Sequence, residues 1–203
     1  MIELRTTHFM ANDRSRLARA LASLAAWSFR IVSLIAIVDA GAGVIAQDLV
    51  QSEARLKSAF IFNFAKFVEW PSDAFSEPNS PLVVGVVGKD ILGPALEQLI
   101  QGKSVNGRPM VVRRFAVGQE LKPCHILFVS GKNEGNLAQI LQGARGSSIL
   151  TVGETDGFLK AGGIIRFVTV KDRLQFEISS ANAGQVGLKI SSKLLQLSRK
   201  PGE

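Results

Sequence analysis

Three residue types that carry much of protein chemistry are scarce or missing in this sequence. It holds one cysteine, two histidines and no tyrosine. A single cysteine excludes a disulfide within the chain and any metal site built on several cysteines. Two histidines leave little for a histidine-based metal centre, and tyrosine catalysis is excluded. Glycine and proline, at 19 and 7 residues, are too ordinary in number for a collagen-like or low-complexity chain.

Apolar residues, by contrast, are plentiful for so basic a chain. The 203 residues are enough for one domain or two small ones, and they include 24 lysines and arginines against 17 acidic residues. Even so, 46% of the residues are hydrophobic and the mean hydropathy is +0.20, which is too apolar for a disordered chain. This combination indicates that apolar residues are concentrated in part of the sequence.

Residues 1–46 have the parts of a secretory signal peptide. An arginine-rich start is followed by the apolar run 31–38 and by small residues up to Ala46. We expect cleavage after Ala46, with Ala42 as the second candidate.

The alternative is an uncleaved inner-membrane anchor, but a spanning helix needs about 20 apolar residues. Arg30 and Asp39 bracket only eight.

Removal of this segment leaves residues 47–203 as one predicted domain. It holds 19 basic and 14 acidic residues, and the basic ones are scattered along the chain. A nucleic-acid-binding protein usually gathers its basic residues into a patch or stripe, so we expect no nucleic-acid partner.

The order of predicted elements in this domain indicates an α/β fold. Apolar periodicity and turn residues predict a helix, alternating strands and helices, a hairpin and a last helix. The helices are predicted at 49–70, 92–101, 133–142 and 186–197; the strands at 82–88, 110–115, 124–129, 148–152, 164–170 and 174–178. Such alternation favours a single layered domain with a mixed, partly parallel sheet flanked by helices.

A phosphate-binding loop is the first chemical motif to test. The segment 85–90 follows a predicted strand and precedes a helix, but it has Val83 where a P-loop needs its first glycine. Asp90 stands where Ser or Thr is required, and its charge would repel phosphate. The segment is better explained as a turn in which Asp90 caps the next helix.

Two further groupings resemble catalytic pairs. Cys124 and His125 are adjacent, but neighbours on a strand point to opposite faces, so we expect a buried thiol rather than a nucleophile. Glu154 and Asp156 follow a predicted strand, at the edge of the sheet where ligands often bind. We expect them to be solvated loop residues, and we predict no catalytic, metal or cofactor site.

The aromatic residues of the first helix suggest an interaction surface. Phe60, Phe64 and Phe67 share one face, which indicates core packing, whereas Phe62 is turned by about 200° from Phe60. Apolar residues on a second face often mark a partner-binding surface. The predicted partner-binding residues are Phe62, Asn63, Lys66, Glu69 and Trp70.

Several ordered motifs in the predicted domain resemble the YfiR family. They occupy residues 56–71, 102–109, 124–130, 150–158, 162–167 and 190–195, and so cover essentially all of it. The resemblance implies a periplasmic, non-enzymatic protein that binds the periplasmic domain of an inner-membrane diguanylate cyclase and inhibits it. It also implies sequestration by an outer-membrane peptidoglycan-binding lipoprotein, and hence a role in cyclic di-GMP signalling and biofilm formation.

Two alternatives remain open at the sequence level. The domain could instead be a small-ligand-binding sensor that works with a sensor kinase or another membrane partner, using the glycine-rich loop 153–163. Members of the YfiR family can use disulfides, whereas this chain has Cys124 alone. A homodimer bridged through that cysteine is a further alternative.

Overall fold

The computed structural model describes residues 50–200, apart from the side chains of residues 132–134. The predicted signal peptide, both candidate cleavage sites and residue 49 of the first predicted helix lie outside the described residues. Within the described part, no helix combines the length and the apolarity needed to cross a bilayer.

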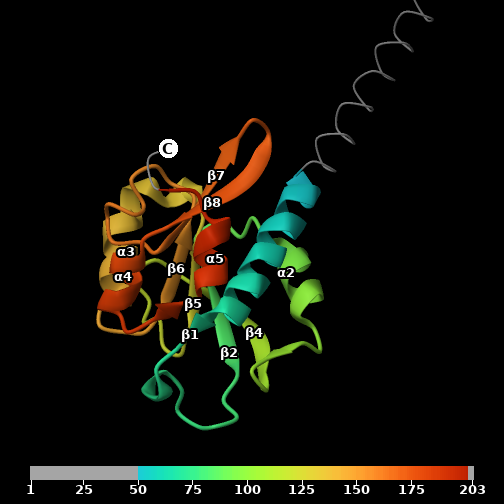
Figure 1. Cartoon of the computed structure of the whole chain (residues 1–203), viewed down its shortest axis with the longest axis vertical. Helices are drawn as coiled ribbons and strands as arrows, with labels where there is room; N and C mark the ends of the chain where they lie inside the picture. Colours follow the sequence, from blue (N-terminus) through green and yellow to red (C-terminus); the bar gives the residue numbers. More distant parts are fainter. Residues whose placement is uncertain (1–49, 201–203) are drawn as a thin grey trace, which may run out of the picture. The chain divides into compact units, whose positions relative to one another are not determined.

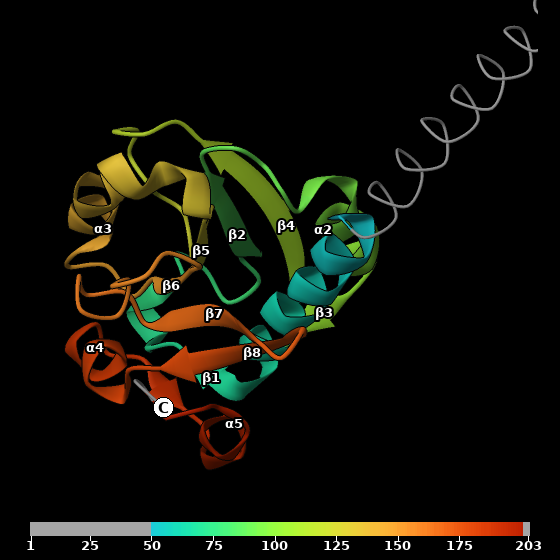
Figure 2. The same ribbon diagram turned by 90° about the horizontal axis from the view of Figure 1, so that it is seen from above.

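A seven-stranded mixed sheet forms the centre of the domain, in the order β3-β4-β2-β5-β6-β7-β8 (Figure 1). Five strands in the middle run parallel, and β3 and β8 pair antiparallel at the two edges. The strands are β2 (Leu82–Val87), β3 (Ser104–Val105), β4 (Arg108–Phe115), β5 (Ile126–Val129), β6 (Leu150–Gly153), β7 (Ile165–Val170) and β8 (Arg173–Ile178). The predicted α/β fold with a mixed sheet is therefore confirmed, and Figure 2 shows the sheet curled as a half-barrel.

The central strands are apolar throughout because each face of the sheet has its own core. In β5, Ile126 and Phe128 pack into one cluster, while Leu127 and Val129 pack into the other. Successive residues of a strand point to opposite faces, so a strand covered on both sides needs no polar alternation. The helices α2 (Gly93–Ile100) and α3 (Leu137–Ala144) each contribute to one of these cores.

The helix over residues 50–67 lies in the opening of the half-barrel, between β8 and α2 (Figures 1 and 2). Its predicted core stripe is confirmed: the rings of Phe60 and Phe64 lie 5.1 to 5.9 Å from those of Phe167 and Phe176 on β7 and β8. Such aromatic contacts stabilise a core beyond the area they bury. This helix therefore packs against the β7–β8 edge of the sheet.

The same helix ends three residues earlier than predicted. Residues 68 and 69 form a short strand, β1 (Val68–Glu69), which pairs antiparallel with β9 (Lys189–Ile190). The prediction of a helix up to Trp70 was wrong because this pairing takes up the backbone groups of residues 68 and 69.

The prediction of a single C-terminal helix is also wrong. The chain instead forms α4 (Ser180–Gln185), β9 and α5 (Ser192–Leu197). Ser179 and Ser191 each accept a hydrogen bond from the backbone N–H three residues on, which starts a new helix each time. Between them Gly187 has a φ of +74°, a conformation that ends a helix.

The predicted hairpin is confirmed. The hairpin between β7 and β8 turns through Lys171 and Asp172, which both have positive φ, as a two-residue hairpin turn requires. Asp90 accepts hydrogen bonds from the N–H groups of Leu92 and Gly93 at 3.1 and 2.8 Å, but it was wrongly predicted as the N-cap of α2: the helix begins only at Gly93, and its N-cap is Leu92. Elsewhere β5 begins two residues later than predicted, and α3 begins four residues later, because the 3-10 helix Gly131–Asn136 precedes it.

Candidate functional site

Phe62 lies on the outer face of the first helix, half-buried at the edge of the core. Lys66 places its ammonium 4.4 Å from the centre of the Phe62 ring, and Lys103 lies 5.0 Å from it. Both distances fall within the range of a cation–π interaction. Phe62, the exposed Asn63, Lys66 and Lys103 form what we call the Phe62 patch.

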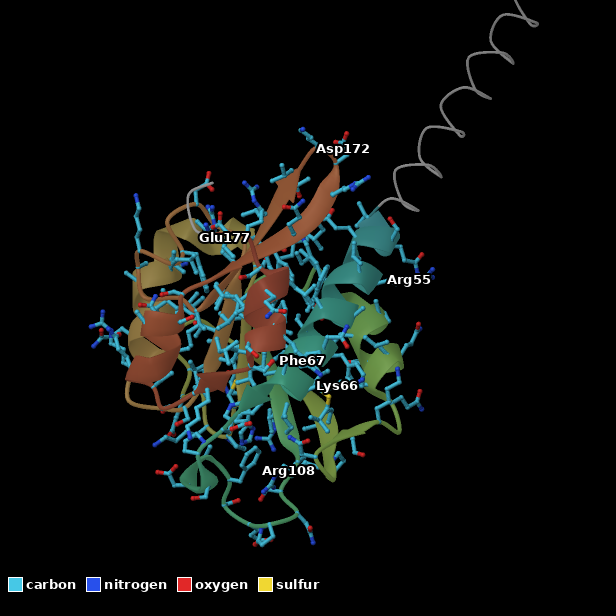
Figure 3. All side chains as sticks on the ribbon, viewed as in Figure 1. Arg55, Lys66, Phe67, Arg108, Asp172 and Glu177 are labelled. Atoms are coloured by element: carbon cyan, nitrogen blue, oxygen red, sulfur yellow. The ribbon has the colours of Figure 1, made fainter. Side chains whose placement is uncertain are left out.

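Glu69 and Trp70 line a groove that continues from this patch. The groove has a volume of about 340 Å³, and Phe75 and Arg108 also line it. Glu69 is exposed, whereas Trp70 is half-buried and donates its indole N–H to the carbonyl of His125 at 3.3 Å. We call this hollow the Trp70 groove. The five predicted partner-binding residues thus divide between the Phe62 patch and the Trp70 groove. Figure 3 shows Lys66 of the patch and Arg108 of the groove on the same side of the molecule.

Lys103 and Arg108 belong to this surface but were not predicted. The turn that places Arg108 was visible in the sequence, because Asn106 and Gly107 have the positive φ values, 51° and 78°, that join β3 to β4. Nothing in the sequence indicated that Arg108 lies over an aromatic ring. Its guanidinium carbon is 3.7 Å from the centre of the Phe75 ring.

The loop of residues 71–81 is held against the sheet by contacts with His125 and Arg108. Phe75 stacks on the imidazole with ring centres 4.3 Å apart, and Arg108 donates to the carbonyls of Glu77 and Ser80. His125 Nδ1 accepts the backbone N–H of Val83 at 3.0 Å, so Nε2 carries the proton and donates to a carbonyl of the loop at 3.0 Å. His125 is therefore a structural residue in its neutral form.

The pKa of His125 is lowered, mainly by burial. The hydrogen bond to the loop carbonyl acts in the opposite direction and raises the pKa, while the charge of nearby Arg108 lowers it further. The neighbouring Cys124 is buried and donates its thiol proton to the carbonyl of Ile126 at 3.2 Å. Burial raises the pKa of Cys124 to about 12. Because the thiolate is the nucleophile, this geometry supports the predicted buried thiol rather than a Cys–His catalytic pair.

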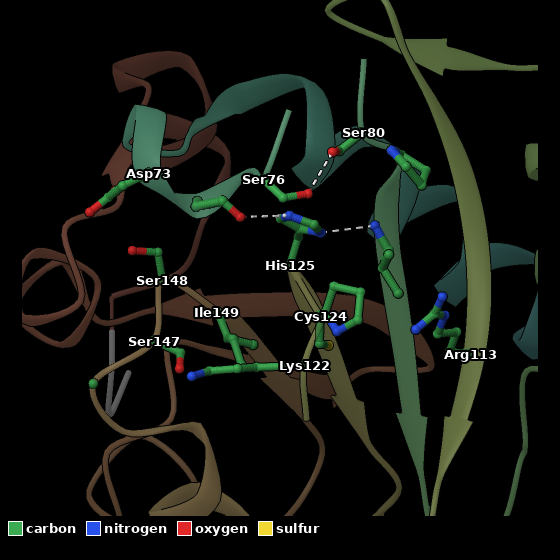
Figure 4. Close-up of a pocket in the computed structure, with 15 residues that line it drawn as sticks. Asp73, Ser76, Ser80, Arg113, Lys122, Cys124, His125, Ser147, Ser148 and Ile149 are labelled. Carbon is green, nitrogen blue, oxygen red and sulfur yellow. Dashed lines mark hydrogen bonds between the residues drawn. The ribbon is translucent and has the colours of Figure 1, made fainter. Parts of the chain in front are cut away.

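A cavity of about 530 Å³ lies beside His125, near the amino ends of β2, β5 and β6 (Figure 4). Its apolar wall includes Val83, Pro123 and Ile149, and its polar lining includes the side chains of Arg113 and Lys122. The remaining lining residues are Asp73, Ala74, Ser76, Ser80, Pro81, Cys124, His125, Gly146, Ser147 and Ser148. The small-ligand alternative of the sequence analysis used the glycine-rich loop 153–163, which follows β6 at the opposite, carboxyl edge of the sheet.

At that carboxyl edge the structure shows ion pairs. Lys57, only 5% exposed, pairs with Glu154 and, at 2.5 Å, with Glu53. Burial is the largest influence on the pKa of Lys57 and lowers it, but the two carboxylates together raise it above the ordinary value. Glu154 is therefore held by a cation from the first helix.

Asp156, whose side chain is exposed, pairs with Arg166. The two side chains are 2.6 Å apart, and Arg166 also pairs with the buried Glu177 at 2.9 Å. The expectation of solvated loop residues holds for the exposed Asp156 but was wrong for Glu154, which is partly buried because it pairs with the buried Lys57. The two carboxylates have separate cationic partners. Among the described residues, no three His, Cys, Asp or Glu side chains gather as a metal site requires.

Comparison with known proteins identifies a family. The sequence model of the family described as YfiR/HmsC-like matches residues 54–199, which is more than half of the chain and nearly all of the described domain. No curated protein matches the sequence.

Proposed function

The chain belongs to the YfiR/HmsC-like family, and we propose that it is a periplasmic regulatory protein that binds a membrane-bound diguanylate cyclase and inhibits it. The family is regulatory rather than catalytic, and it points to the cyclic di-GMP pathway. A protein of this kind acts by binding, which agrees with the ion-paired carboxylates and the protonated thiol described above.

The Phe62 patch, together with the Trp70 groove, is the observation that supports binding by this face. A half-exposed phenylalanine under two lysines lies next to a hollow lined by a tryptophan and an arginine. Aromatic residues and arginine dominate the centres of protein–protein interfaces. Lys66, Lys103 and Arg108 outnumber Glu69, so the fitting partner surface is acidic around an apolar centre.

The proposal is tested by measuring binding to the periplasmic domain of a diguanylate cyclase from the same cell. We expect Phe62→Glu and Lys66→Glu each to weaken binding, Phe62→Glu by about thirtyfold or more, as for an interface residue worth at least 2 kcal/mol. Binding should also weaken as salt is raised, because the cations lie at the surface.

Lys160→Glu is the matched control, since it reverses an exposed lysine in the loop after β6. It should leave binding unchanged. Because Phe62 also packs on the core, each variant is first checked for an unchanged circular dichroism spectrum. If folded Phe62→Glu and Lys66→Glu variants keep wild-type affinity, this surface is not the interface. If the wild-type chain does not bind the cyclase, the partner is a different protein, such as the peptidoglycan-binding lipoprotein.

A second function, ligand sensing beside a sensor kinase or another membrane partner, is favoured by the cavity next to His125. The glycine-rich loop 153–163 does not support it, because Gly153 and Gly163 press against the ring of Phe158. Thermal-shift screening with small molecules and cell-wall fragments separates the two functions. A sensor should be stabilised by a ligand, whereas a protein that only binds a partner protein should not.

A further inference from the structure

We infer that the cavity beside His125 binds a small organic anion, with Arg113 and Lys122 contacting its carboxylate or phosphate group. The cavity shares no lining residue with the Phe62 patch or the Trp70 groove. The inference therefore stands independently of the proposed cyclase partner.

The two arginines near the carboxyl end of β4, Arg113 and Arg114, show why Arg113 is available to a ligand. They are adjacent, so their side chains leave opposite faces of the strand. Arg114 is held by Asp90 and Glu97, at 2.8 and 2.7 Å. Arg113 lines the cavity instead, and no hydrogen bond or ion pair joins it to another described side chain.

Lys122 brings a second positive charge to the cavity. Figure 4 shows Lys122 and Arg113 on either side of Cys124 in this view. Lys122, too, has no ion pair within the described part of the chain, and Asp73 is the single carboxylate among the lining residues. With His125 neutral, the lining carries one net positive charge, and the hydroxyls of Ser147 and Ser148 add hydrogen-bonding groups.

The cavity is formed before any ligand arrives, because its wall is hydrogen-bonded. His125 is fixed by its two backbone partners, and the hydroxyls of Ser76 and Ser80 are 2.9 Å apart in the loop above it. A volume of about 530 Å³ suits a small molecule, and preformed cavities with an apolar wall and a few polar groups are typical ligand sites. The ligand should therefore have an apolar body as well as its anionic group.

The first helix explains why this site lies at the amino edge of the sheet. Parallel sheets usually bind ligands beyond the carboxyl ends of their strands. In this domain Lys57 of the helix pairs with Glu154, directly after β6, and so occupies that edge. The amino edge keeps the larger hollow, with two cations that lack carboxylate partners among the described side chains.

The test is a calorimetric titration of the full chain with phenyl phosphate and with benzoate. Inorganic phosphate and benzyl alcohol serve as probes of the anionic group alone and the apolar body alone. We expect at least one aromatic anion to bind, and benzyl alcohol and inorganic phosphate to bind at least tenfold more weakly. The better of phenyl phosphate and benzoate identifies the preferred anionic group. Arg113→Gln and Lys122→Gln should each weaken binding about tenfold or more, as the loss of a charged hydrogen bond does.

Arg173→Gln and Lys160→Gln are matched controls, because both residues are exposed and neither lines the cavity. They should leave the affinity unchanged. Three results would overturn the inference: no binding of either aromatic anion at millimolar concentration, equal binding of benzyl alcohol, or full affinity in both cavity variants. Arg113 and Lys122 lie at the surface, so their substitution should not unfold the chain.

Discussion

The ring of Phe158 is held between two glycines, and this contact gives the sharpest test of the packing. A Cβ atom built at Gly163 would lie 2.2 Å from the Cδ1 and Cε1 atoms of Phe158. One built at Gly153 would lie 2.3 Å from Cε2, on the opposite edge of the ring. The ring therefore cannot move away from one glycine without approaching the other.

We expect Gly163→Ala to lower the free energy of unfolding by about 3 kcal/mol, the upper end of the usual cost of overpacking. Ordinary contact distances for a Cβ begin near 3.4 Å, so a shift of more than 1 Å is needed in a part of the core where Phe158 is fully buried. In a domain of this size the loss corresponds to a fall in Tm of about 10 °C. Urea unfolding followed by circular dichroism measures it, with the m-value as a check on two-state behaviour.

Gly184→Ala is the matched control, because this glycine lies in α4 with nothing within 4 Å of the added Cβ. It should leave stability unchanged or raise it by up to about 1 kcal/mol. Phe158→Leu provides the second check, since a smaller side chain makes room for the added methyl group. The reasoning is refuted if Gly163→Ala is as stable as wild type, or if its cost and that of Phe158→Leu simply add in the double variant.

Three further predictions follow from the buried polar groups. Because the pKa of His125 is lowered in the folded state, its neutral form stabilises the fold above about pH 6.5, and this stability is lost as the pH falls below that value. Urea midpoints between pH 5 and 8 should show this fall in the wild type and a smaller one in His125→Asn. Lys57→Met should lower the free energy of unfolding by about 3 kcal/mol, because it leaves Glu154 without its cation, and Glu154→Gln in the same chain should recover part of the loss. Cys124, with a pKa of about 12, should react with iodoacetamide at pH 8 about a thousandfold more slowly than in the unfolded chain, and rapid native alkylation would contradict its burial.

The sequence predicted the parallel centre of the fold well, since its signals there were local. In β2 every residue is apolar or glycine and every one is buried, and the predicted hairpin forms between β7 and β8. The prediction failed in the C-terminal region because the structure there depends on contacts between distant parts of the chain. Val186, Ile190 and Leu194 have helical spacing, but the pairing of β9 with β1 depends on residues more than 100 positions away, which periodicity does not reveal.

The candidate surface was predicted only in part. The sequence singled out Phe62, which is half-buried and packs at the edge of the core, but its two cations come from different parts of the chain, and only Lys66 lies on the same helix. The cavity was missed altogether, since Arg113 and Lys122 come to line the same cavity only through the order of the strands. The small-ligand alternative used the loop 153–163 at the carboxyl edge, and nothing in the sequence indicated that Lys57 would pair with Glu154 there.

The position of the first helix also sets the order in which this domain can be completed during synthesis. Phe60 and Phe64 leave the ribosome early, but Phe167 and Phe176, which cover them, are made about a hundred residues later. Contacts between such distant parts of a chain form slowly, and until they form the aromatic stripe has no cover. A chain that stops before the β7–β8 hairpin would therefore keep an exposed phenylalanine stripe and be prone to aggregate, however well its parallel strands had paired.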